Sequence, residues 1–353
     1  MFNRTFGLVA IVPFVLVASS LTPATAADYG SGCSVCGGGN YEVDYDAPGT
    51  GFSGDSDFSV ADPDANFVLR GSMGVASITG VEHVYTPPDG ANNLSELIWT
   101  GVSPIGSLDA SARLLDGWTL RGHLDAALPG QSKMTDYDWI PPYNTGYGMD
   151  DWSDRSISPN THLDWYFSGD VALGRDLPIN EAVTVNVNGG FKYTDTQWTA
   201  VGGSYIYSTG GFRNDVGNIP DVPAVKYRQQ LPAVFLGANA IVKDGPWTVD
   251  AGGRAGLVLL GQARDDHYLR VPPRYTIDQM TWGKMLSADA KIDYAVSDHL
   301  SLFAEGSYEK TFADRVPKQY RQISDNSLML PIYNIGGGEL DVASLKVGLK
   351  GNF

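Results

Sequence analysis

The sequence predicts an all-β protein, a ten-stranded antiparallel transmembrane β-barrel of the outer membrane with long extracellular loops. Three observations predict it: an export signal at the N-terminus, apolar residues at every second position over long stretches, and short turns that alternate with long polar connections. Short turns at one end and long loops at the other are typical of outer-membrane barrels. Bacterial single-chain barrels also have an even number of strands.

The first 26 residues have the features of a secretory signal peptide. Arg4 supplies a positive charge, residues 8–17 form an apolar run, and Ala24-Thr25-Ala26 matches a small-residue cleavage pattern. The run is too short to cross a bilayer as a helix, which takes roughly 20 residues. We therefore expect residues 1–26 to be removed on export, leaving Ala27 as the first residue.

Residues 27–65 are rich in Gly, Ser and Asp and contain few apolar side chains, so we expect a flexible leader. The two cysteines of the chain, Cys33 and Cys36, lie in this leader. A tight disulfide in an oxidising compartment is the first interpretation.

Residues 66–353 are expected to form the barrel. The alternation is clearest at 183–188 (VTVNVN), and it recurs at 162–173 and 247–257. In a soluble β-sandwich, the structural alternative, a second sheet would have to cover the apolar face, whereas in a barrel lipid covers it. The expected strands cover residues 66–84, 94–113, 117–128, 161–174, 181–198, 224–241, 246–263, 276–294, 299–312 and 338–353, with long loops at about 129–160, 199–223, 264–275 and 313–336.

The charge is strongly acidic, with 24 Lys and Arg against 40 Asp and Glu and a formal net charge of −16. This argues against nucleic acid as a partner, because nucleic-acid binding needs basic surface. It permits a cationic partner or substrate, although solubility alone also explains it.

Two pairs of ionisable residues in the long connections could carry chemistry. Asp136 and Asp138 share a face of an extended segment, and neighbouring carboxylates raise each other's proton affinity. Asp265 and His267 have the same spacing, so the carboxylate could fix the imidazole tautomer. For the first pair the alternative is an Asx-rich loop or a cation site, and for the second it is an exposed histidine in an acidic loop. We expect no metal site, because no ligand spacing is recognisable.

The chain resembles the omptins, outer-membrane proteases of Gram-negative bacteria. The most similar stretches are 202–208 (GGSYIYS) and 211–217 (GFRNDVG), and the resemblance covers about 70–353. It implies an aspartic-type endopeptidase in the cell outer membrane, with its active site facing outside, that cleaves cationic peptides or proteins near basic residues.

The resemblance also implies a role for each residue. Asp136 and Asp138 would face Asp265 and His267 across a cleft and activate a water molecule. The family's substrate-binding acids match Glu82 on the first strand and Asp154 on a long loop. No cofactor is implied, and we expect a monomer.

Two departures from the family pattern concern specificity and lipid. A second pocket acid is replaced by Ala263, so the preference for Arg or Lys is expected to change. Lipopolysaccharide is a possible activator, but its binding residues are not matched. The corresponding positions are Phe191, Tyr193, Asp195, Gln230 and Thr281, and none is basic.

A conflict of register also predicts a structural irregularity. On the strand from Trp247 the odd-numbered residues face lipid, and this alternation would point Asp265 and His267 outward. A bulge or twist between about Leu260 and Asp265 must reset it.

Three functional alternatives stay open. They are a serine mechanism that uses Ser156, a non-catalytic barrel that acts as an adhesin or surface-binding protein, and a diffusion pore. The pore is disfavoured because inward charges such as Arg254 and Asp170 could fill a ten-stranded lumen.

Overall fold

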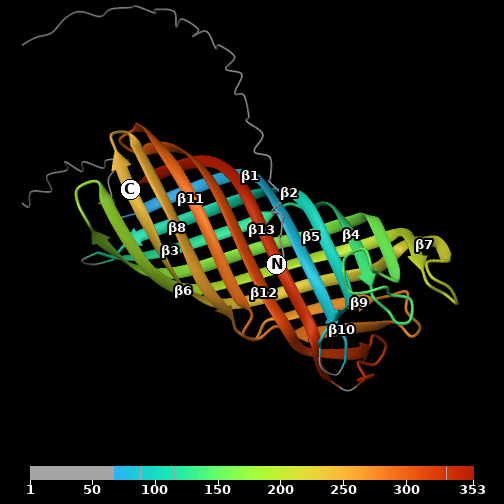
Figure 1. Ribbon diagram of the computed structural model, residues 1–353. Coiled ribbons are helices and arrows are strands. Elements are labelled where there is room, and N and C mark those ends of the chain that lie inside the picture. The colour runs from blue at the N-terminus through green and yellow to red at the C-terminus, as the bar shows by residue number, and fades with distance from the viewer. Residues whose placement is uncertain (1–66, 88–89, 115–116, 331) are drawn as a thin grey trace, which may run out of the picture. The chain divides into compact units, whose positions relative to one another are not determined.

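The computed structural model describes residues 67–353 apart from 88, 89, 115, 116 and 331, so the predicted signal peptide, leader and cysteines lie outside the described residues. The described part is built from antiparallel strands (Figure 1). It contains no helix that could cross a membrane. The strands are β1 (Phe67–Tyr85), β2 (Asn93–Arg113), β3 (Trp118–Ala127), β4 (Gly130–Asp138), β5 (Asp154–Pro178), β6 (Val183–Tyr207), β7 (Asp215–Asp244), β8 (Trp247–Val258), β9 (Gln262–His267), β10 (Arg274–Gln279), β11 (Lys284–Ser297), β12 (Leu300–Gln322) and β13 (Tyr333–Asn352).

The strands close into a ring, because β1 pairs with both β2 and β13. Three positions in the ring are shared by two successive strands. β3 and β4 both lie between β2 and β5, β8 and β9 both pair with β7, and β10 and β11 both pair with β12. Ten positions result, which confirms the predicted ten-stranded antiparallel barrel.

The outer surface marks the membrane-spanning half. On β8, Trp247, Val249 and Leu257 are exposed while Asp250 is buried in the lumen, as the alternation predicts. On β7 the apolar outward residues run from Val242 to Val234, and the next outward residues, at 226–230, are polar, Arg228 among them. The strands therefore continue beyond the lipid-facing band.

This extension corrects the expected loop boundaries. β6, β7 and β12 run through much of the segments 199–223 and 313–336, and β4, β9 and β10 occupy parts of 129–160 and 264–275. The alternation of apolar and polar residues fades there because the outer face meets water instead of lipid. Backbone hydrogen bonds between neighbouring strands maintain these segments, and the hydrophobic pattern of a sequence does not reveal such bonds.

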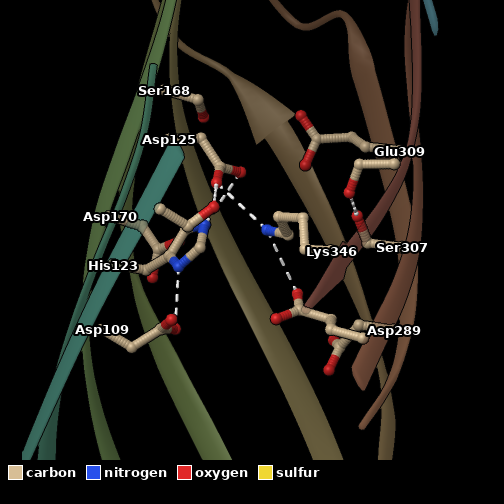
Figure 2. Close-up of polar contacts among 12 residues, drawn as sticks. Asp109, His123, Asp125, Ser168, Asp170, Asp289, Ser307, Glu309 and Lys346 are labelled. Atoms are coloured by element: carbon tan, nitrogen blue, oxygen red, sulfur yellow. Dashed lines mark hydrogen bonds and ion pairs between the residues drawn. The ribbon is translucent and has the colours of Figure 1, made fainter. Parts of the chain in front are cut away.

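The lumen of the membrane-spanning half is filled by ion pairs. His123 Nδ1 lies 2.8 Å from Asp109 Oδ1, and its Nε2 lies 2.9 Å from Asp125 Oδ2. Lys346 Nζ reaches the same Asp125 at 3.1 Å (Figure 2). The cavities between these groups hold only about 150 and 70 Å³. Such a lumen is unsuited to a diffusion pore.

The irregularity predicted on the strand from Trp247 is confirmed. β8 ends at Val258, Leu260 takes a left-handed conformation with φ 54°, and β9 begins at Gln262. After the break the odd-numbered residues face inward, so Ala263 and Asp265 are buried. The neighbouring strand breaks at the same level, between β10 and β11, where Trp282 has φ 68°.

An aromatic layer lies one step below the barrel mouth. Trp99, Trp198 and Tyr227 are fully buried, with ring centroids 5.7–6.3 Å apart. Trp99 pairs with Gly80 and Met134, which stand two residues before Glu82 and Asp136 on their strands. A side chain at Gly80 would meet the Trp198 ring at 2.8 Å, so glycine allows this close packing. The layer forms a rigid floor for the residues above it.

Candidate active site

All six predicted site residues line one cleft of about 310 Å³ at the barrel mouth. Glu82 comes from β1, the Asp136–Asp138 pair from β4, Asp154 from the start of β5, and Asp265 and His267 from β9. Strands on opposite sides of the ring therefore bring together residues that are far apart in the sequence.

The Asp136–Asp138 pair is held at the end of β4. Asp136 pairs across the sheet with Leu97 and Ser156, and Ser95 Oγ donates to its Oδ1 at 3.4 Å. Burial, reinforced by the charge of Asp138, raises the pKa of Asp136 well above its usual range. Burial also raises the pKa of Asp138 to about 6, against a lowering by Ser95. Burial therefore favours the protonated form of both carboxyl groups.

Asp265 and His267 face the cleft from β9, with His267 Nε2 2.5 Å from Asp265 Oδ2. Burial lowers the pKa of His267 to about 4, and Arg270, Arg274 and Lys318 add to this against the opposing charge of Glu82. So short a contact with a carboxylate favours a protonated imidazole, but the free-energy cost of charging a buried ring is larger than this gain. His267 is therefore neutral at pH 7 and can accept a proton.

Asp265 is deeply buried beneath His267, with an exposed fraction of 1%. Neither of its carboxylate oxygens accepts a well-aligned hydrogen bond from the described residues. Burial raises its pKa to about 7, although a hydrogen bond with Glu82 opposes the rise. Asp265 thus changes its charge near neutral pH, where it governs the orientation of the imidazole.

Glu82 is part of a second charged cluster directly behind the cleft wall. It accepts hydrogen bonds from Thr276 Oγ1 at 3.2 Å and from Lys318 Nζ. Lys318 Nζ also lies 2.9 Å from Asp278 Oδ2, and Lys318 has no exposed surface. Burial and then the charge of Asp265 raise the pKa of Glu82 to about 7, while Lys318 lowers it.

Asp154 lies at the outer rim of the cleft and forms no ion pair that the described residues show. Its Oδ1 accepts a hydrogen bond from the Ser208 backbone at 2.8 Å. The adjoining loop is fixed by Arg213, which donates to the Trp152 carbonyl and stacks 3.4 Å from the Trp152 ring centroid. Asp154 is thus a positioned, uncompensated negative charge.

The cationic and aromatic residues of the cleft were not predicted from the sequence: Tyr207, Arg270, Arg274 and Tyr320. Hairpin pairing could have located Arg274, because β9 and β10 form a hairpin in which Arg274 pairs directly with His267. Lys318, behind the cleft, carried no such signal.

The family model "Omptin family" matches residues 63–353. The chain belongs to the omptin family. The plasminogen activator of Yersinia pestis is 25% identical over 262 residues, covering 70% of this chain and 77% of that protein. The outer membrane protease IcsP of Shigella flexneri is 28% identical over 248 residues, covering 67% and 74%.

The fold of this omptin is also shared with a solved structure. The crystal structure of the outer membrane protease OmpT from Escherichia coli matches with a TM-score of 0.74 at 21% identity, covering 82% of this chain and 97% of that one. Fold and family together place this omptin in the outer membrane of a Gram-negative bacterium.

Proposed function

We propose that this omptin is an aspartic-type endopeptidase that uses a water molecule held between the Asp136–Asp138 pair and the Asp265–His267 pair. The observation that carries the proposal is that both pairs line the same cleft, with a neutral base on one side and two carboxyl groups whose burial favours the protonated form on the other. The relative IcsP is named as an outer membrane protease, which supports hydrolysis of a peptide bond.

The reaction follows from the proton positions. Asp265 contacts Nε2 of His267, so Nδ1 is the nitrogen left to take a proton from water. The water oxygen attacks the peptide carbonyl carbon, and the Asp136–Asp138 pair donates a hydrogen bond to the carbonyl oxygen as it becomes negative. The carbon–nitrogen bond then breaks, and the leaving amine takes up the proton held by His267.

The substrate is proposed to be cationic near the cleaved bond. Asp154 offers an uncompensated carboxylate at the rim of the cleft, and the net charge of −16 attracts basic peptides over longer distances. A basic residue beside the scissile bond would pair with Asp154.

Lipopolysaccharide is proposed as an activator, and the monomer as the working unit. The outward positions Tyr193, Asp195 and Gln230 form a hydrogen-bonded patch on β6 and β7. This patch includes Arg228, a basic residue that the sequence comparison missed. Arg228 donates to Asp195 at 2.9 Å and is partly exposed, so it could meet a lipid phosphate.

Peptide cleavage by the refolded barrel, with and without lipopolysaccharide, tests the proposal. Wild-type protein and an Asp136→Ala/His267→Ala double variant are compared on a peptide library that contains Arg, Lys and neutral pairs. We expect cleavage by the wild type and none by the variant. If wild-type protein with lipid cuts nothing, the barrel is an adhesin or surface-binding protein instead.

A further inference from the structure

The cleft wall beside His267 is a regular grid of side chains on three paired strands. The lowest row holds Ala263, Asp278 and Lys318, and the next holds Asp265, Thr276 and Tyr320. The top row holds His267, Arg274 and Gln322. Glu82 approaches the middle of this grid from β1 through its hydrogen bond from Thr276. The grid forms one wall of a subsite directly beside the proposed base.

The carboxylates at the base of this subsite already have a cation of their own. Lys318 is fully buried and pairs with both Glu82 and Asp278, while the third member of its row is the apolar Ala263. A substrate Arg or Lys that reached Glu82 would meet the charge of Lys318 without displacing it. A buried ammonium with two carboxylate partners is costly to expose or remove.

The upper part of the same subsite has positive charges without carboxylate partners, although the Arg274 guanidinium lies 5.9 Å from the Tyr320 ring centroid. Arg270 and Arg274 both line the cleft, and neither forms an ion pair with any described residue. The Nε of Arg274 is buried and has no hydrogen-bond partner in the described part of the chain. Burial and the charge of Arg270 lower the pKa of Arg274. An anion between these guanidinium groups would relieve both the unpaired donor and the repulsion.

We propose that the subsite bounded by Glu82, Thr276, Arg274 and Tyr320 takes an acidic side chain of the substrate and rejects Arg and Lys. Lys318 neutralises the acids at its base, and Arg274 binds the substrate carboxylate. The inference rests on the proposed endopeptidase and refines its substrate. One acidic residue occupies this subsite, and one basic residue meets Asp154 on the opposite side of the cleft.

Cleavage of matched peptides tests the inference. The peptides carry Glu, Gln or Arg at either residue of the scissile bond, with a Lys or Arg retained on the other side, and the products are identified by mass spectrometry. For wild-type protein we expect kcat/KM to favour Glu over Arg by roughly tenfold or more at one of the two positions. Preference for Arg at both positions would overturn the inference and leave the endopeptidase standing.

Variants assign the preference to the two side chains. Arg274→Gln is expected to lower kcat/KM for the Glu peptide about tenfold and to change that for the Gln peptide less than about threefold. Lys318→Thr is expected to raise cleavage of the Arg peptide. Arg264→Gln is the matched control, because Arg264 pairs with Asp266 and is not a cleft residue. Equal losses on the Glu and Gln peptides in Arg274→Gln would contradict the assignment.

A binding measurement keeps the two proposals apart. Fluorescence anisotropy measures the same peptides on an Asp136→Asn variant, which need not cleave them. Tighter binding of the Glu peptide, lost in Asp136→Asn/Arg274→Gln, supports the subsite even if no peptide is cleaved by the wild type. Equal binding of the Glu and Arg peptides, or binding of neither, overturns it. The result for Lys318→Thr counts only if heat-dependent gel mobility shows that this variant folds into a barrel. If it does not fold, Arg274→Gln alone tests the inference.

Discussion

The barrel contains two buried charge systems, one in the membrane-spanning half and one at the mouth, and they differ in how the charges are matched. In the lower system Lys192, Arg254 and Lys346 each lie 2.6–3.1 Å from a carboxylate. At the mouth, Lys318 pairs with Glu82 and Asp278, but Arg270 and Arg274, which line the cleft, form no ion pair with described residues.

The carboxylates show the same contrast. Asp125 in the lower system contacts both His123 and Lys346, whereas Asp136 at the mouth has another carboxylate, Asp138, as its charged neighbour. Matched networks hold the barrel together. Unmatched charges around a cleft keep protons and donors available for a substrate, and they shift the pKa values of catalytic groups. The comparison therefore assigns stability to the lower system and chemistry to the upper one.

The largest expected effect comes from removing the acid of the upper system. Asp136→Ala should lower kcat/KM about 10³-fold, because the carbonyl oxygen loses its proton donor. Unfolding in urea should change little, since among the described residues Asp136 forms no ion pair and receives only a long hydrogen bond from Ser95 Oγ. Asp266→Asn is the control, as Asp266 pairs with Arg264 and is not a cleft residue. Full activity in Asp136→Ala would end the assignment of chemistry to this pair.

The reverse effect is expected in the lower system. Lys346→Met leaves Asp125 and Glu305 without their shared cation and should destabilise the barrel by about 3–5 kcal/mol. The measurement is the urea midpoint in detergent, beside kcat/KM corrected for the folded fraction. A loss of corrected kcat/KM without a loss of stability would contradict the assignment of stability to the lower system and chemistry to the upper one.

The dependence on pH sharpens the comparison, because the carboxylate that orients His267 titrates near neutrality. Burial raises the pKa of Asp265 to about 7, so the orienting charge is present above that pH and is lost as pH falls through it. His267, with a pKa of about 4, stays neutral throughout. We expect kcat/KM to fall by up to about tenfold from pH 7 to pH 6, as coupled groups titrate together. A flat profile from pH 5 to pH 8 would contradict this reading.

The smallest expected effect concerns the loop that carries Asp154. Arg213→Ala removes a cation–π contact and the donors to the Trp152 carbonyl, so Asp154 is held less firmly. KM for a basic peptide should rise about threefold while kcat stays within twofold, since the contact is partly exposed. A neutral peptide should show no change in KM. An equal rise in KM for both peptides would contradict the claim that Arg213 acts by positioning Asp154.

The sequence predicted the barrel well where lipid imposes a pattern. The alternation at 247–257 predicted β8, and the conflict with an inward Asp265 predicted a break between about Leu260 and Asp265, where Leu260 takes its left-handed conformation. Beyond the lipid-facing band, the alternation of apolar and polar residues did not predict the strands. Segments 199–223 and 313–336 read as loops, because polar side chains on both faces leave no period of two.

The candidate site was predicted in part for a similar reason. Asp136, Asp138, Asp265 and His267 stand in local pairs that a sequence shows directly. Lys318 could not be found in this way, since its partner Glu82 lies 236 residues away and the ring closure between β1 and the last strands brings them together. Ala263 indicated an altered pocket, but only the fold shows that Lys318 pairs with Glu82 and Asp278 behind the cleft wall.

One measurement tests the central claim most directly: kcat/KM of His267→Ala and Ser156→Ala, side by side on one cleaved peptide. Ser156 pairs with Asp136 across the sheet and is the hydroxyl that a serine mechanism would need. Activation of water by the two pairs predicts a loss of at least about 10²-fold for His267→Ala and a change of less than about threefold for Ser156→Ala. Retained activity in His267→Ala, or lost activity in Ser156→Ala with its fold intact, would contradict the account.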